Sequence, residues 1–428
     1  MAEATSDQPN SVSTTAPIAP PLTSYTPRYI DIGINLADPI FRGRYHGKSR
    51  HPDDLQAVVG RAVEVGCTKL IVTGSSFKSS RDALKLAKEF PGIVFATAGI
   101  HPCSSSIFSP SHHKHHDESQ SEGEDEAEHT PACDPDPSQP IPDGDGVDLA
   151  RSEKIIADLA DLITRARKDF PSSSSNPGEL VAFGEFGLDY DRLHYCSKEV
   201  QLHSFSAQLR LAASLTPQLP LFLHSRAAHA DFVRLLKEAF GPRLERLEKG
   251  GVVHSFTGTV DEMRELMDLG LYIGVNGCSF KTAENCEVVK EIELSRLMLE
   301  TDGPWCEVRP SHEGWKYLVE FEARAKAAAA AAAAAAPSTA QGQAGTPENQ
   351  QQQQQGKKKN QKKDPEVLER YKTVKKEKWE EGAMVKGRNE PCTIERIAKI
   401  VAGIKGVSIE EVCEAAWANT VKVFGLES

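Results

Sequence analysis

Residues 180–185 read LVAFGE, a short apolar run that ends on the acidic Glu185. Similar apolar, β-branched runs recur along the chain: YIDIGIN (29–35), KLIVTG (69–74), VFATAGI (94–100), LPLFLH (219–224), GVVHSF (251–256), LYIGVNG (271–277) and LMLETD (297–302). Each run is apolar on both faces, as parallel strands covered by helices are. The sequence therefore predicts eight buried parallel strands.

Amphipathic helical patterns lie between most of these runs. In residues 53–66, for example, the apolar side chains from Leu55 to Val63 fall on one stripe. Similar patterns occur at 198–215, 228–240, 260–270, 393–404 and 408–424, and the last begins with a capping box of Ser408 and Glu411. Eight strand–helix units in about 300 ordered residues predict an α/β fold of the TIM (β/α)8 barrel type. The alternative is an open doubly wound sheet, but the sequence has no GxGxxG motif after an early strand to support it.

Three segments have low complexity and few branched apolar residues, and we expect them to be disordered. They are an N-terminal arm at 1–27, an acidic and His-rich insertion at 104–150, and an Ala/Gln/Lys-rich insertion at 323–364. The run Ala327–Ala336 in the last segment has high helix propensity. The remainder of residues 28–428 is predicted to form a single TIM-barrel domain that these insertions interrupt.

The net charge of −11 comes from 61 acidic and 50 basic residues and at first argues against a nucleic-acid substrate. Residues 104–148, however, hold twelve acids against the single base Lys114, a difference that equals the whole net charge. The rest of the chain is formally neutral, so the acidity does not exclude DNA. Nine cysteines without a CxxC pair, and no signal or membrane-spanning run, predict reduced thiols inside the cell and no membrane partner.

Ionisable side chains stand at the ends of the predicted strands: His101, Glu185, His224, His254 and Asp302. A lone histidine at such a place is usually a structural one, and a lone carboxylate can cap a loop or pair with a base. Their joint occurrence favours a site, because the carboxyl ends of barrel strands converge on one mouth. A mixture of nitrogen and oxygen donors suits a divalent metal ion.

The local strings around these residues resemble the TatD family of metal-dependent deoxyribonucleases, in particular its eukaryotic branch. The matching strings are DIGINL (31–36), AGIHP (98–102), GEFGLDY (184–190), LFLHSRAAH (221–229), VVHSFTGT (252–259), GVNGCSFKT (274–282), ETDGPW (300–305) and RNEP (388–391). They occur in order over about 300 residues, and the unmatched parts are the low-complexity segments. The resemblance implies a TIM barrel, which agrees with the count of strands.

The resemblance also implies roles for the site residues. Glu185 would be a carboxylate shared by two metal ions, His224 and His254 would ligate one ion, and Asp302 would ligate the other and orient the attacking water. The family often carries an HxH pair in its first strand, where this chain has Gly33 and Asn35. Glycine cannot ligate and an amide is a poor ligand for a transition metal, so one position should bind its ion more weakly. We therefore expect one or two divalent ions per chain, with Mg2+ as the best fit and Mn2+ or Zn2+ as alternatives.

Further residues are candidates for contacts to the substrate or to the metal ligands. Arg226, Lys281 and Arg388 are candidates for binding phosphate, although exposed bases are common in any protein. Trp305 is a candidate for stacking on a base, with packing beneath the loop as the alternative. His101, Asn35, Asn389 and Glu390 complete this set.

These features predict a hydrolase of ester bonds, a deoxyribonuclease that cleaves DNA by metal-activated water, and an exonucleolytic action on single strands or ends. One alternative is hydrolysis of another ester, such as that of an aminoacyl-tRNA. A second is a non-catalytic scaffold that has lost its HxH pair. We expect a monomer located in the cytoplasm, the nucleus or both, since the lysine cluster at 357–363 is compatible with nuclear import.

Overall fold

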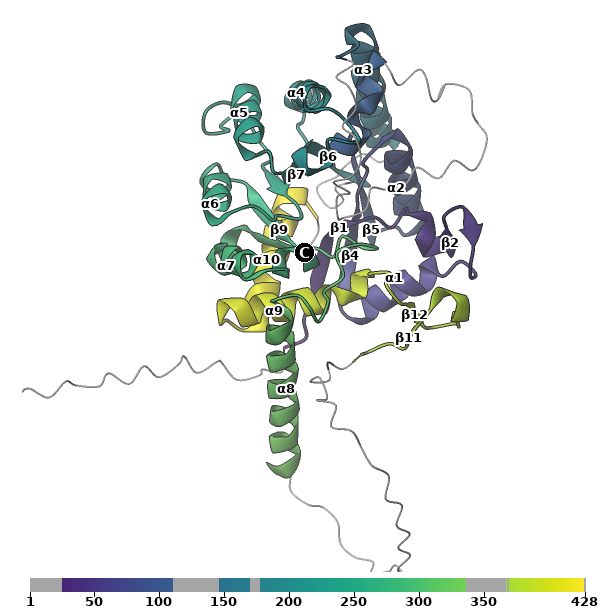
Figure 1. The fold of residues 1–428 in the computed structure, drawn as a ribbon, viewed down its shortest axis with the longest axis vertical. Coiled ribbons are helices and arrows are strands. Elements are labelled where there is room, and N and C mark those ends of the chain that lie inside the picture. The colour runs from purple at the N-terminus through teal and green to yellow at the C-terminus, as the bar shows by residue number, and fades with distance from the viewer. Residues whose placement is uncertain (1–24, 111–145, 170–177, 336–366, 368, 427–428) are drawn as a thin grey trace, which may run out of the picture.

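The computed structural model describes residues 25–110, 146–169, 178–335, 367 and 369–426 (Figure 1). Most of the predicted arm, at 1–24, and the parts of the two insertions at 111–145 and 336–364 lie outside the described residues.

Eight parallel strands form one sheet in the order β1-β4-β5-β6-β7-β8-β9-β10, which confirms the predicted barrel. The strands are β1 (Tyr29–Ile34), β4 (Cys67–Val72), β5 (Val94–Ala98), β6 (Leu180–Asp189), β7 (Leu221–Arg226), β8 (Gly251–Val253), β9 (Tyr272–Val275) and β10 (Leu297–Leu299). The segment after β10 returns to β1. There the Asp302 amide donates to the Gly33 carbonyl at 2.8 Å, and the Asn35 amide donates to the Gly303 carbonyl at 2.8 Å. These bonds bring the two edge strands together on the carboxyl side of the sheet.

Most helices surround the sheet, while α8 (Trp315–Ala335) packs against α9 (Ile394–Lys405) and projects away from the barrel (Figure 1). The helices are α1 (Leu55–Glu64), α2 (Phe77–Glu89), α3 (Leu149–Asp169), α4 (Lys198–Ser214), α5 (His229–Phe240), α6 (Val260–Asp268), α7 (Ala283–Glu291), α8 (Trp315–Ala335), α9 (Ile394–Lys405) and α10 (Ile409–Phe424). The predicted capping box of Ser408 and Glu411 is present at the start of α10. Two short two-stranded sheets lie outside the barrel sheet. One pairs β2 (Arg44–Tyr45) with β3 (Lys48–Ser49), and the other pairs β11 (Thr373–Val374) with β12 (Met384–Val385).

The two ends of the barrel differ in character. An inner apolar cluster joins residues near the starts of the strands, such as Ile30 and Val181, to Trp417, Val423 and Phe424 of α10. The last turns of α10 therefore pack against the amino-terminal end of the barrel. Polar side chains lie at the opposite end of the barrel, at the carboxyl ends of the strands.

Some predicted boundaries were wrong. Residues 104–108, which were expected to be disordered, instead belong to the 3-10 helix η2 (Pro102–Phe108), in which Phe108 is buried. Helix α8 continues to Ala335, which agrees with the helix propensity of the alanine run. Strand β6 runs four residues past Glu185, to Asp189, whereas β10 ends at Leu299, three residues before Asp302. No helix among the described residues is both long enough and apolar enough to span a bilayer.

Candidate metal centre

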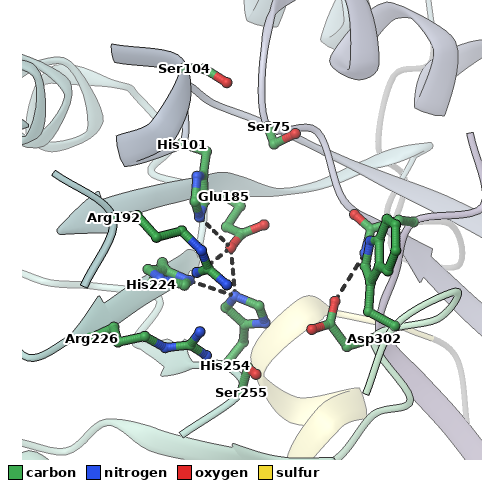
Figure 2. A pocket seen from close by; sticks show the side chains of 12 residues that line it. Ser75, His101, Ser104, Glu185, Arg192, His224, Arg226, His254, Ser255 and Asp302 are labelled. Carbon is green, nitrogen blue, oxygen red and sulfur yellow. Dashed lines mark hydrogen bonds and ion pairs between the residues drawn. The ribbon is translucent and has the colours of Figure 1, made fainter. Parts of the chain in front are cut away.

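A small pocket opens at the carboxyl end of the barrel strands (Figure 2). It is lined by Asn35, Ser75, His101, Ser104, Glu185, Arg192, His224, Arg226, His254, Ser255, Asp302 and Trp305. All five ionisable residues that the sequence placed at strand ends therefore reach one cavity. Their convergence follows from the barrel, whose carboxyl ends point to the same side.

Glu185 lies at the centre of this cavity. The pairing of β6 with β7 is irregular between Gly184 and Phe186, so Glu185 is displaced from the regular ladder. Its Oε1 atom lies 2.6 Å from Nε2 of His254, 3.0 Å from Nδ1 of His224 and 3.3 Å from Nε2 of His101. Figure 2 shows the three rings turned toward this carboxylate.

The outer nitrogen of each of two rings meets a second carboxylate. Nε2 of His224 lies 3.1 Å from Asp189, and Nδ1 of His254 lies 3.3 Å from Glu300. An ionised carboxylate only accepts hydrogen bonds, so each outer nitrogen carries the proton and each neutral ring keeps its lone pair on the inner nitrogen. This is the arrangement by which proteins orient metal-binding histidines. The two inner nitrogens are 3.2 Å apart, facing Glu185, so the donor set fits a cation.

The charges of the cluster depend on burial and on these contacts. Burial opposes the charged form of His254, but Glu185 and Glu300 prevail and raise its pKa well above the usual range. Burial likewise opposes ionisation of Glu185, whose pKa is nevertheless held well below the usual range by the charges of His254 and His101. In the protein alone a proton on His254 thus balances Glu185. A bound metal ion would take the place of that proton.

His101 differs from the other two histidines. Its Nδ1 accepts a hydrogen bond from the Cys103 amide at 3.1 Å, so a neutral ring carries its proton on Nε2, which faces Glu185. Its distances alone would allow it to share a metal with Glu185 and His224. The bond from Cys103 instead makes His101 a hydrogen-bond donor inside the cavity, because its inner nitrogen has no free lone pair.

Asp302 and Asn35 occupy the other side of the cavity. Asn35 donates from Nδ2 to Oδ1 of Asp302 at 2.9 Å, and its own Oδ1 accepts from the Thr73 hydroxyl at 2.6 Å. The thiol of Cys306 donates to Oδ2 of Asp302 at 3.2 Å. Both oxygens of Asp302 are thus satisfied by neutral donors. Burial raises the pKa of Asp302 to about 7, with His254 acting in the opposite direction.

Gly33 leaves room for Glu300. A Cβ atom at position 33 would overlap Oε2 of Glu300, and Phe222 lies 3.2 Å away from that Cβ position. A histidine at position 33 therefore does not fit beside the carboxylate as it is placed here. Glu300 is fully buried and also accepts from the Ser255 amide, so it has little freedom to move.

The other candidates divide into two groups. Arg226 and Trp305 line the cavity, as does Arg192, which the sequence reasoning missed. The indole Nε1 of Trp305 is buried and makes no hydrogen bond with the described residues. Lys281 does not line the cavity. Its place at the end of η5 (Gly277–Phe280) sets it apart from the other candidate bases.

The RNEP string forms part of a buried ionic network and does not line the cavity. Arg388 binds Asp54 at 2.6 Å and Glu390 at 2.9 Å, and Glu390 also binds Arg61 at 2.8 Å. Asn389 donates to the carbonyls of Thr301 and Trp305 at 2.9 and 2.8 Å. Asn389 therefore supports the loop that carries Asp302.

Sequence reasoning gave no role to Asp189 and Glu300, although both lie within the matching strings. Asp189 is four residues after Glu185 in one strand, and side chains at even spacing share a face of a strand. Glu300 is the first residue after β10. Only Glu300 carried a signal in the sequence, as an acid in the predicted run 297–302 two residues before Asp302, whereas Asp189 lies beyond the predicted end of its strand.

A parallel eight-stranded barrel with imidazole and carboxylate donors at its carboxyl end is the architecture of a metal-dependent hydrolase. The model of the family described as TatD related DNase matches residues 30–425, so the chain belongs to this family of ester hydrolases. The curated protein "Deoxyribonuclease Tat-D" of Schizosaccharomyces pombe is 38% identical over 92% of this chain and 95% of its own length. The protein of the same description from Saccharomyces cerevisiae is 32% identical over 93% and 91%.

Two solved structures support the same fold. An uncharacterised amidohydrolase from Saccharomyces cerevisiae superposes with a TM-score of 0.69 at 29% identity, covering 93% of this chain and 99% of the other. A TatD family hydrolase from Entamoeba histolytica gives a TM-score of 0.64 at 26% identity, covering 94% and 99%. The resemblance inferred from the sequence strings is thereby confirmed.

Proposed function

We propose that this protein is a metal-dependent deoxyribonuclease that hydrolyses phosphodiester bonds at the ends of single strands. The observation that carries the proposal is the cluster of Glu185, His224 and His254, with Asp189 and Glu300 on the outer ring nitrogens. Two fungal relatives described as deoxyribonucleases support the substrate. A Pantoea relative, 32% identical over 66% of this chain, is described as a "3'-5' ssDNA/RNA exonuclease TatD" and supports action on single-strand ends.

Glu185, His224 and His254 would hold the metal ion, and Asp302 would hold a second ion only weakly because neutral donors already satisfy it. The chemistry that such an ion supplies when bound is charge stabilisation at phosphoryl oxygens and activation of water. Imidazole donors suit Mn2+ or Zn2+, whereas Mg2+ prefers oxygen ligands. The preference for Mg2+ from the sequence stays a prediction, as does location in the cytoplasm or nucleus.

The remaining residues of the cavity act on the substrate. Asp302 accepts the proton of the attacking water, because a base whose pKa lies near 7 is well matched to this task. The guanidinium groups of Arg192 and Arg226 bind the phosphate that is cleaved. His101 presents its Nε2 proton to an oxygen of that phosphate, and the free indole N–H of Trp305 adds a donor beside it.

The test is nucleotide release from single-stranded DNA labelled at its 5' or 3' end, after chelation and re-addition of Mg2+, Mn2+ or Zn2+ in turn. Glu185→Gln should lower the rate more than about a hundredfold. Changing a residue that binds the metal directly should reduce activity more than changing a carboxylate that only orients a metal-binding histidine. The substitution Glu199→Gln, at an exposed position in α4, is the matched control. Full activity of Glu185→Gln, or cleavage that resists chelation, would contradict the proposal. An aminoacyl-tRNA substrate in the same assay tests the alternative ester reaction.

A further inference from the structure

Two thiols meet beside Asp302. Cys278 lies in η5, directly after β9, and Cys306 lies four residues beyond Asp302 in the loop after β10. Their Sγ atoms are 2.9 Å apart. A disulfide bond is about 2.05 Å long, so the sulfur atoms need to approach by less than about 1 Å to be joined.

The backbone around the pair holds the two loops in this close approach. A Cβ atom at Gly277 would overlap the carbonyl oxygen of Cys306, so only glycine permits the two loops to lie this near to each other. Cys306 has a left-handed backbone, with a φ of 54°. A non-glycine residue keeps such a φ only where its surroundings determine it. The backbone conformation of the two loops therefore determines the short distance between the thiols.

Access differs between the two sulfurs. Cys278 is buried, whereas Cys306 is partly exposed and is the only described cysteine that is not buried. An oxidant in solution therefore reaches Cys306 first, and Cys278 is placed to react in a second step. A partly exposed thiol beside a second, resolving thiol is the usual arrangement of a redox-sensitive pair.

The geometry points to a reversible disulfide between Cys278 and Cys306 that controls the Asp302 side of the cavity. With a peroxide as oxidant, the sulfur of Cys306 attacks one peroxide oxygen, the O–O bond breaks and one water leaves, giving a sulfenic acid. The sulfur of Cys278 then attacks that of Cys306, the S–O bond breaks and a second water leaves. Two thiols lose two electrons and two protons, and hydrogen peroxide is reduced to two waters.

The consequence for the site follows from a single hydrogen bond. The thiol proton of Cys306 is donated to Oδ2 of Asp302. A disulfide has no such proton, so this oxygen loses its donor while Asn35 continues to hold the other. This part of the inference rests on the proposed function of Asp302. Loss of an outer-shell partner typically costs tenfold or more in activity or metal affinity, so we expect an oxidised protein about tenfold less active.

The chemical test uses the full chain treated with hydrogen peroxide, followed by alkylation and peptide mapping. We expect a peptide pair joined through Cys278 and Cys306, the loss of two hydrogen atoms from the intact mass, and full reversal by a dithiol reductant. In Cys278→Ser, Cys306 should instead accumulate as a sulfenic acid that a 1,3-diketone probe traps. Free alkylation of both cysteines after treatment, or a bond to a different cysteine, would overturn the inference.

The functional test compares each variant with its own reduced form. Wild type and the control Cys286→Ser, a buried thiol in α7 away from the cavity, should lose about tenfold on oxidation and recover on reduction. Cys306→Ser, which has no thiol to oxidise beside Asp302, should be insensitive. A disulfide that forms without changing activity would overturn the inference that the bond regulates the Asp302 side of the cavity. If the reduced protein cleaves no DNA at all, the proposed function fails, while the mapping experiment still decides whether the bond forms.

Discussion

The two sides of the cavity are built from different chemistry. On the imidazole wall, formed by Glu185, His224 and His254, inner nitrogens converge on one carboxylate and outer nitrogens meet Asp189 and Glu300. On the amide wall, formed by Asn35 and Asp302, the carboxylate receives an amide N–H and a thiol S–H. The first wall presents lone pairs and a negative charge to a cation. The second satisfies its only carboxylate with neutral donors.

This difference indicates which wall of the cavity needs a cation. Lone pairs 3.2 Å apart repel unless a proton or a metal ion lies between them, so the imidazole wall needs a cation. The amide wall has no such need, because Asn35 supplies a donor where the family often has a histidine. In the proposed mechanism Asp302 then acts as the base, with its pKa raised by burial to about 7.

The largest effect that tests this comparison is expected from Asp189→Asn. The change leaves the shape of the side chain but removes the charge that keeps the proton on the outer nitrogen of His224. The same oxygen accepts from the buried Arg192 guanidinium at 2.6 Å, so the amide oxygen stays in place but the charge that both neighbours face is gone. We expect the rate of DNA cleavage and the affinity for Zn2+ or Mn2+ to fall by about 10- to 100-fold.

Titration calorimetry and the cleavage assay should be run on the same preparations, with Asp191→Asn as the control, since Asp191 is the exposed acid two residues away. An Asp189→Asn protein that binds metal as tightly as wild type would show that the imidazole wall does not depend on its outer carboxylates.

A smaller but more specific effect is expected from Asn35→Asp. Two carboxylates would then face each other in place of a donor and an acceptor that are 2.9 Å apart. Such a pair either shares a proton or takes up a cation. We expect the number of bound divalent ions per chain to rise from one to two, with a change of several-fold in the rate. Metal content after dialysis measures the first quantity directly.

Asn35→Ala is the matched control for this substitution, because it removes the donor without adding a charge. It should leave the metal content at one ion. Two tightly bound ions in wild type would contradict the distinction between the walls, and would return the site to the arrangement with an ion on each side.

The sequence allowed the imidazole wall to be predicted far better than its surroundings. Glu185, His224 and His254 stand in or directly after apolar runs, and strand periodicity plus barrel topology is enough to bring them together. Asp189 and Glu300 were missed because their roles depend on which ring nitrogen each one faces, a matter of side-chain geometry. Arg388 was a candidate for binding phosphate because it lies in a matching string, yet its buried partner Asp54 is 334 residues away. Ion pairs at that separation leave no local signal in a single sequence.

The smallest effect is expected from Thr73→Val, which tests how the amide wall is oriented. The Thr73 hydroxyl donates to the oxygen of Asn35 and thereby turns the nitrogen of the amide toward Asp302. Valine has nearly the same shape but no donor, so the amide can rotate and present its oxygen to the carboxylate. We expect stability to fall by about 1 kcal/mol, the usual net contribution of a hydrogen bond, and the cleavage rate to fall a few-fold.

The control is Thr97→Val, because the buried hydroxyl of Thr97 accepts from the Gly74 amide and does not touch Asn35. Urea unfolding should show comparable losses for the two variants, whereas only Thr73→Val should slow cleavage. Equal rates in both variants would mean that the orientation of Asn35 has no influence on Asp302.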